Sequence, residues 1–145
     1  EAVDWLTRVY DQWKEDAQVV EQWLSVQSSS AALTNLDRIK ALMQHDAFDF
    51  FNPNELRSVV GAFAAQNFEH FHKKDGSGYQ FLADQIIKLD DQNPQIAARL
   101  MVPLTRWRKY DKSRRGLMLS ELGRIHRKES LSKDLREVVE KTLPH

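Results

Sequence analysis

Two segments of the chain begin with Asn-Pro, and this dipeptide constrains the fold more than any other feature. Asn52 and Asn93 each precede a proline, and apolar residues with helical spacing follow both. Asparagine caps a helix by accepting backbone N–H bonds, and proline is tolerated in the first turn because its missing N–H would have no partner there. Glu55 stands where a carboxylate can bond back to the cap. Both segments are therefore predicted to be helices with defined starts.

Helical periodicity continues along the rest of the chain. Further helix starts are predicted at Thr34, Asp111, Ser132 and Ser77, the last as a capping box with Gln80. No segment alternates apolar and polar residues convincingly, as a half-buried strand does. Helices of about ten to eighteen residues with short connections favour antiparallel neighbours. The predicted fold class is all-α, a curved right-handed solenoid of about eight antiparallel helices of the armadillo/HEAT-like kind, forming a single domain over residues 1–145.

Composition limits the class of protein. With 145 residues, 41% of them apolar, the chain has the composition of a soluble globular domain. It has no cysteine, which fits a reducing, cytoplasmic compartment and rules out a disulfide framework or a thiolate zinc site. Its apolar runs are too short to span a bilayer, so no membrane partner is expected. The chain starts at Glu1 inside a helical pattern and without a signal peptide, so we expect it to be cut from a longer one.

The charge is balanced overall but unevenly distributed. Residues 1–105 hold 9 basic and 15 acidic side chains, whereas residues 106–145 hold 12 and 6. The segment Arg106–Arg115 interleaves six basic groups with two aromatics, a pattern that superficially suits single-stranded nucleic acid. On a helix, however, those aromatics would point inward while the basic groups remain in solvent. We interpret the segment as a solvated helix end and expect no nucleic-acid partner.

The motifs of a catalytic centre are missing. Zinc hydrolysis needs a His-Glu-x-x-His helix and a third ligand, and none of the five histidines has that spacing. His70 and His72 are the one close pair, which could chelate a metal only if their segment were extended. Gly76-Ser77-Gly78 lacks the spacing of a phosphate-binding loop and is interpreted as a capped turn. We therefore predict no catalytic residue, no metal site and no cofactor in this chain, and an isolated chain without activity.

A series of short motifs runs from Asn52 to Asp111. In order along the chain they are Asn52-Pro-Asn-x-x-Arg57, Gly61-Ala62-Phe63, Phe71-His72, Asp75-Gly-Ser-Gly-Tyr79, Asn93-Pro-Gln95 with Arg99, and Tyr110-Asp111. In their order and spacing these motifs resemble the C-terminal domain of bacterial aminopeptidase N, a zinc aminopeptidase family of the gluzincin type. More weakly, the resemblance extends from about Val9 to the end of the chain. Phe68, where the family commonly has proline, and the basic pair Lys73-Lys74 depart from the family pattern.

The resemblance implies a function for the domain. In the family, the helical domain closes over a catalytic domain and encloses the active site in an internal chamber. Side chains that match Arg57, Gln95 and Arg99 lie on the chamber wall near the substrate, and zinc is held elsewhere, by two histidines and a glutamate of the catalytic domain. The implied partners are the catalytic domain of the same polypeptide and a peptide substrate, within a monomeric parent enzyme.

Two expectations remain open at this point. The alternative function is a free-standing helical-repeat module that binds a protein partner. If the chain is one domain of an enzyme, one face should expose more apolar surface than a monomer normally does. The candidate side chains are Trp5, Tyr10, Trp13, Phe48, Phe50 and Phe51.

Overall fold

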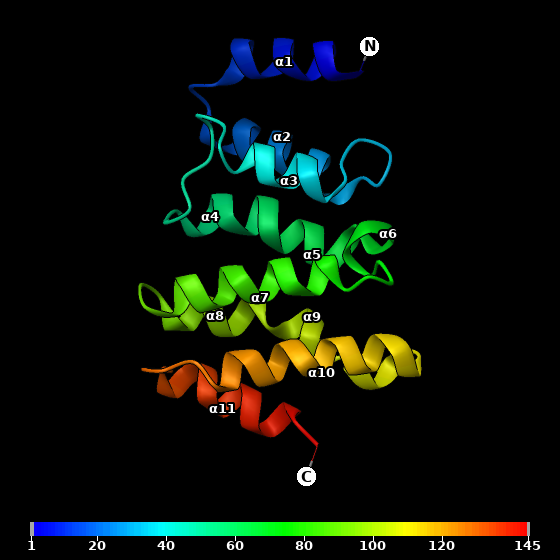
Figure 1. The fold of residues 1–145 in the computed structure, drawn as a ribbon. Helices are drawn as coiled ribbons and strands as arrows, with labels where there is room; N and C mark the ends of the chain where they lie inside the picture. The colour runs from blue at the N-terminus through cyan, green and yellow to red at the C-terminus, as the bar shows by residue number, and fades with distance from the viewer. Residues whose placement is uncertain (1, 145) are drawn as a thin grey trace. The chain divides into compact units, whose positions relative to one another are not determined.

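The computed structural model describes residues 2–144, and these residues form helices joined by turns and short loops, without a strand (Figure 1). The all-α prediction is confirmed. Because α4, η1 and α5 are continuous, the described residues contain eight helices of seven residues or more. Two of them, α3 and α8, have only seven residues and are shorter than predicted. The elements are α1 (Ala2–Trp13), α2 (Ala17–Ser29), α3 (Leu36–Leu42), α4 (Pro53–Leu56), the π-helical turn η1 (Arg57–Gly61), α5 (Ala62–Gln66), α6 (Phe68–Phe71), α7 (Ser77–Asp90), α8 (Pro94–Leu100), α9 (Val102–Thr105), the 3₁₀ turn η2 (Trp107–Lys109), α10 (Lys112–His126) and α11 (Lys133–Thr142).

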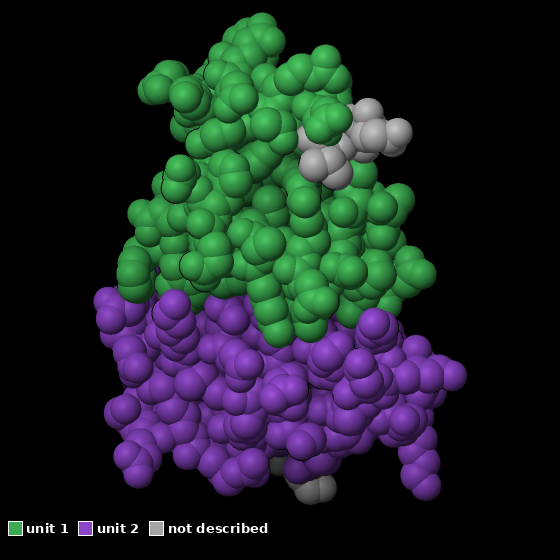
Figure 2. Space-filling model, turned by 45° about the horizontal axis from the view of Figure 1, so that its top comes forward, with its two compact units in different colours: residues 1–70 green, residues 71–145 purple. Residues whose placement is uncertain are grey.

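The chain divides into two compact units, residues 1–70 and residues 71–145, which are coloured separately in Figure 2. Each has its own apolar core. The sequence prediction of a single helical domain stays a prediction. Within the described residues, none of the helices combines the length and the apolar character needed to cross a bilayer.

Residues 1–70 are built around α2, which packs against α1, η1 and α5. Asp16 caps α2 by accepting from the backbone N–H groups of Gln18 and Val19. Trp23 then donates its indole N–H to the carbonyl oxygen of Leu6 at 2.6 Å, which ties α2 to α1. Both residues are buried, so this hydrogen bond fixes the two helices in an apolar environment.

The loop between α2 and α3 is held by one buried amide. Asn67 donates from Nδ2 to the carbonyl oxygens of Ser28 and Thr34, at 3.1 and 3.0 Å, and is 1% exposed. The predicted cap at Thr34 is wrong by one residue, because Asn35 accepts from the N–H of Arg38 and α3 begins at Leu36. The side chain of Thr34 is buried instead, so it lies inside the loop that Asn67 organises.

Residues 71–145 are built around α7, which packs on α8 and α10. The predicted capping box at Ser77 is wrong, because Gly76 is the cap residue in the left-handed region, with φ +77°, and Ser77 bonds to Asp75 instead. Gly78 sits so close to the chain before it that a Cβ atom would lie 2.1 Å from the carbonyl oxygen of Phe71. The glycines thus allow the turn and the close approach of α7.

A buried carboxylate joins the end of α7 to the start of α11. Asp90 is 3% exposed and accepts hydrogen bonds from the backbone N–H of Ser132, at 3.0 Å, and from its hydroxyl. Lys128 lies 3.6 Å from the same carboxylate and 2.8 Å from Asp91. Ser132 in turn caps α11 by accepting from the N–H of Leu135. The helix start predicted at Ser132 is confirmed. Beside it, Lys128 forms ion pairs with Asp90 and Asp91.

Candidate functional site

Arg57 is positioned by the Asn-Pro start of its helix. Asn52 accepts from the N–H groups of Asn54 and Glu55 at 3.0 and 3.4 Å. Glu55 does bond back to the cap, but its carboxylate accepts from the side-chain amide of Asn52 at 2.8 Å and from the N–H of Asp49 at 2.7 Å. These hydrogen bonds fix the first turn of the helix. Arg57 follows in the next turn, so its position depends on this start.

Arg57 opens a π-helical turn in the middle of a continuous helix. The N–H of Ala62 bonds to the carbonyl of Arg57, five residues back, where an α-helix would use the fourth. Short π-helical stretches are rare and occur frequently at functional sites. The exposed guanidinium donates from Nε to the carbonyl of Pro53 at 3.3 Å and also bonds to the side chain of Asn54. Bonds to its own helix therefore restrain the Arg57 side chain. The π-helical turn that it opens cannot be predicted from the periodicity of the sequence.

Gln95 and Arg99 lie four residues apart on α8 and share its exposed side. Asn93 caps α8 by accepting from the N–H of Ile96 at 3.3 Å. Ala97 and Leu100 form the buried side of α8, which packs on α7 and α11. No hydrogen bond or ion pair is seen for the Arg99 side chain among the described residues. The structure thus brings Gln95 and Arg99 together, while the predicted convergence of Arg57 with them remains a prediction.

The two histidines of the His-Phe-His segment have separate partners. His70 lies within α6, so the segment is not extended as metal chelation would require. Its Nε2 lies 3.1 Å from the carbonyl oxygen of Ala31, whereas Nδ1 of His72 lies 2.7 Å from the hydroxyl of Tyr79. Among the described residues, no group of three or more His, Cys, Asp or Glu side chains could hold a metal ion.

His72 belongs to an aromatic and charged cluster that sequence reasoning missed. Tyr110 stacks on its ring at 4.4 Å, and Arg114 donates to its carbonyl oxygen at 2.8 Å while pairing with Asp111 at 2.9 Å. Burial, and to a smaller degree the Arg114 guanidinium, lower the pKa of His72 below 6.5. Burial also raises the pKa of Tyr79 to about 12. Both rings are therefore neutral at pH 7, and the cluster has the character of a packed structural contact.

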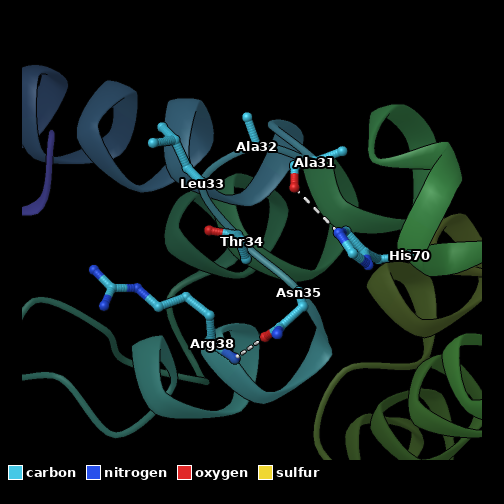
Figure 3. A pocket seen from close by; sticks show the side chains of 7 residues that line it. All are labelled: Ala31, Ala32, Leu33, Thr34, Asn35, Arg38 and His70. Atoms are coloured by element: carbon cyan, nitrogen blue, oxygen red, sulfur yellow. Dashed lines mark hydrogen bonds between the residues drawn. The ribbon is translucent and has the colours of Figure 1, made fainter.

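A hollow of about 410 Å³ lies beside the loop between α2 and α3 (Figure 3). Figure 3 shows the guanidinium of Arg38 and the ring of His70 pointing to opposite sides of that loop. The Arg38 guanidinium donates to Gln27 at 3.1 Å. An acid and a base that act together must face a common atom. Arg38 and His70 do not. The hollow is lined by Ala31, Ala32, Leu33, Thr34, Asn35, Arg38 and His70.

The apolar surface differs in part from the predicted one. Trp5, Trp13 and Phe51 are exposed, as expected. The other three candidates, Tyr10, Phe48 and Phe50, are half-buried. Val26, Phe68 and Val102 are also exposed, in addition to the side chains predicted from the sequence.

Comparison with known proteins identifies the family. A family model described as "Domain of unknown function (DUF3458_C) ARM repeats" matches residues 1–144. The chain belongs to the DUF3458_C family of ARM-repeat domains. This DUF3458_C domain is 46% identical to aminopeptidase N of Haemophilus influenzae over 131 residues, 90% of the chain and 15% of that protein. It is 41% identical to aminopeptidase N of Escherichia coli over 133 residues, 92% of the chain and 15% of that protein.

A solved structure agrees with these relatives. The crystal structure of Legionella pneumophila aminopeptidase A in complex with aspartic acid matches the DUF3458_C domain with a TM-score of 0.85 and 38% identity, over 94% of this chain and 16% of that one. The resemblance to the C-terminal ARM-repeat domain of aminopeptidase N is therefore confirmed. The domain spans about one-sixth of the length of the proteins it matches.

Proposed function

We propose that this DUF3458_C domain is the C-terminal domain of a zinc-dependent aminopeptidase that removes N-terminal residues from peptides. Its role is to enclose the active-site chamber, to restrict access to it and to help position the substrate. The observation that carries the proposal is the 46% and 41% identity to two aminopeptidases N over 90% and 92% of the chain. Zinc would be held by the catalytic domain of the same polypeptide, where it would activate water and polarise the scissile carbonyl.

The chemistry of three side chains supports the positioning role. A guanidinium donates several N–H bonds in a fixed plane, which suits peptide carbonyls and a C-terminal carboxylate. The Gln95 amide both donates and accepts, so it can pair with a peptide unit. Arg99 and Gln95 share an exposed side of α8, and the Arg57 guanidinium is restrained by bonds to its own helix. Such restraint lowers the side-chain entropy lost on binding.

The direct test is Arg99→Ala in the parent enzyme. Loss of hydrogen bonds to a charged group costs about 1.5–3 kcal/mol, so we expect kcat/KM on peptides to fall about 10- to 150-fold. Zinc content should not change, because Arg99 is not a ligand. Arg136→Ala is the matched control, since it removes an exposed arginine of α11. Unaltered kcat/KM on several peptides would show that Arg99 has no part in positioning the substrate.

A double-mutant cycle tests whether Arg57 acts on the same ligand. If Arg57 and Arg99 bind one peptide carboxylate, the two alanine substitutions should be non-additive on peptides with a free C-terminus. The coupling should disappear on the same peptides with an amidated C-terminus, because the charged acceptor is removed. Strict additivity on both substrates would assign the arginines to separate roles.

The alternative is a free-standing helical-repeat module that binds a protein partner. The exposed apolar side chains Trp5, Trp13 and Phe51 also suit this function. The two functions are separated by the gene: a reading frame that continues upstream of Glu1 into a His-Glu-x-x-His segment supports the aminopeptidase, and a frame without one supports the module.

A further inference from the structure

A polar hollow of about 410 Å³ lies between α2 and the π-helical turn η1, within residues 1–70. Helix α2 contributes four residues at helical spacing, so they line one side of it, and η1 contributes Ser58. The four residues are Gln18, Glu21, Gln22 and Ser25. Because Ser25 and Ser58 are small, they leave open the space that two amides and a carboxylate border.

The two helices beside this hollow run in the same direction. Near their C-terminal ends, Asn67 donates from Nδ2 to the carbonyl oxygen of Ser28 at 3.1 Å. Near their N-terminal ends, α2 also packs on α4, and Ser58 lies across the hollow from α2. The hollow therefore lies toward the N-terminal ends, where the helix that follows Asn52 also carries Arg57.

Arg57 is held at the edge of the hollow through Asn54. The Ser58 hydroxyl, which lines the hollow, donates to the carbonyl oxygen of Asn54 at 2.8 Å. The side chain of Asn54 in turn accepts from the Arg57 guanidinium. An extended peptide rises roughly 3.3 Å per residue, so two or three residues span the ~5.4 Å of one helical turn. One peptide can therefore contact both the hollow and the guanidinium.

The side chains that α2 contributes to this hollow have no hydrogen bond or ion pair among the described residues. Gln27, farther along the same helix, is different, because its amide donates to the carbonyl of Trp23 and accepts from Arg38. Glu21 is half-buried, so its carboxylate has lost part of its hydration without gaining a cation. Such a set of unpaired polar groups is available to a ligand that has both donors and acceptors.

We infer that the hollow is a subsite for the residues of a peptide substrate that follow the cleaved bond. The amides of Gln18 and Gln22 pair with its main chain, because a primary amide presents both a donor and an acceptor, as a peptide unit does. The Glu21 carboxylate selects a lysine or arginine side chain at one position of the peptide. The inference rests on the proposed function, because it requires that this domain face the substrate.

The size and charge of the hollow favour a peptide over other ligands. Its volume lies within the range of roughly 300–1,000 Å³ that is typical of ligand sites. A polar lining gives little affinity for an apolar molecule, whose binding depends on buried apolar area. A nucleic acid requires basic groups, whereas the one charged residue among the described residues that line the hollow is Glu21. An uncharged main chain with a basic side chain fits both the amides and the carboxylate.

A lysine moved along the substrate tests the subsite in the full-length polypeptide. Peptides that begin with leucine carry one lysine among alanines, at the second, third, fourth or fifth position, and each is compared with norleucine at the same position. We expect kcat/KM to favour lysine about three- to tenfold at one position, the range between an exposed ion pair and a hydrogen bond to a charged group. Glu21→Gln should abolish this preference. Glu69→Gln, which removes an exposed glutamate of α6 beyond the C-terminal end of α5, should keep it.

A charge reversal and a crosslink separate direct contact from an indirect effect of Glu21. Glu21→Lys should transfer the preference from lysine to glutamate at the same position, which the loss of a structural contact would not do. A benzoylphenylalanine peptide whose first peptide bond is reduced, and so resists hydrolysis, should crosslink to α2 between Gln18 and Ser25. Q18A/Q22A should lower that yield about tenfold, because two hydrogen bonds are lost. Gln66→Ala, at an exposed amide of α5, should leave it unchanged.

Failure of the subsite and failure of the proposed function give different results. A full-length polypeptide that cleaves no peptide would reject the proposed function. Cleavage without a lysine preference, a preference that survives Glu21→Gln, or crosslinks that lie only outside α2 and η1 would reject the subsite alone.

Discussion

Residues 1–70 and residues 71–145 differ in how completely each unit buries its large apolar side chains and pairs its polar atoms. Among the described residues, five of the six large apolar side chains that are exposed lie in residues 1–70, and the sixth is Val102. The four buried polar atoms without a hydrogen-bond partner among the described residues also lie in residues 1–70. They belong to Ser28, Thr34, Arg38 and Asn67.

In residues 71–145 charged side chains meet partners within the unit. Lys128 pairs with Asp90 and Asp91, and Arg124 lies 2.8 Å from both Asp84 and Glu121. A buried ion is costly unless it is paired and hydrogen-bonded, and the Asp90 carboxylate meets this requirement inside the unit. The difference teaches that residues 71–145 pair their buried carboxylate within the unit, whereas residues 1–70 leave large apolar side chains exposed and buried polar atoms without a partner among the described residues.

The largest effect on stability is expected in residues 71–145, for the substitution Asp90→Ala. It leaves Lys128 and the N–H of Ser132 without their buried partner, so we expect the free energy of unfolding to fall by about 3–5 kcal/mol. Chemical denaturation measures the loss, and hydrogen exchange should show it first in α11. Asp91→Ala, which removes the 59%-exposed partner of the same lysine, should cost less than about 1 kcal/mol. Equal losses would mean that burial does not distinguish the two carboxylates.

The counterpart in residues 1–70 is Asn67→Ala. The substitution removes two buried hydrogen bonds to the carbonyls of Ser28 and Thr34, and we expect a loss of about 2–4 kcal/mol. Hydrogen exchange should increase in the loop between α2 and α3. Gln66→Ala, at the exposed neighbouring position, is the control and should be nearly neutral. A neutral Asn67→Ala would show that the loop does not depend on this amide.

The helices were predictable from sequence where the cause is local. The Asn52 and Asn93 caps and the starts at Asp111 and Ser132 follow from side chains that bond to backbone N–H groups two or three residues on. The errors have tertiary causes. Thr34 was a plausible cap by type, but its carbonyl is bound by Asn67, more than thirty residues away. A single sequence gives no signal for such a contact.

The candidate site was predictable to a smaller extent. The spacing of Gln95 and Arg99 places both on one side of α8, which periodicity alone dictates. The π-helical turn at Arg57 is different, because it adds one residue to a helix whose apolar pattern still reads as regular. The His72 cluster could not be predicted, because its members come from three separate segments: the turn before α7, α7 itself and the start of α10.

The pH dependence of stability tests the His72 cluster. Because burial and Arg114 lower the pKa of His72 in the folded state, the folded protein binds the proton less readily than the unfolded chain. The contribution is fully present above pH 6.5 and is lost as the pH falls below it. We expect His72→Gln to flatten the fall in unfolding free energy between pH 7 and pH 5. An NMR titration that places the pKa of His72 above 6.5 would reverse this sign.

The smallest expected effect probes the comparison most directly, through Thr34→Val. Thr34 is 2% exposed, and its hydroxyl has no partner among the described residues. Valine keeps the shape and removes a group that loses its hydration on folding, so we expect stability to stay the same or to rise by up to about 1 kcal/mol. Thr142→Val is the matched control in residues 71–145, where the hydroxyl donates to the carbonyl of Val138 at 2.7 Å and its loss should cost about 0.5–1.5 kcal/mol. If Thr34→Val costs as much as the control, the hydroxyl has a partner in the folded protein, and the contrast in polar satisfaction between the two units disappears.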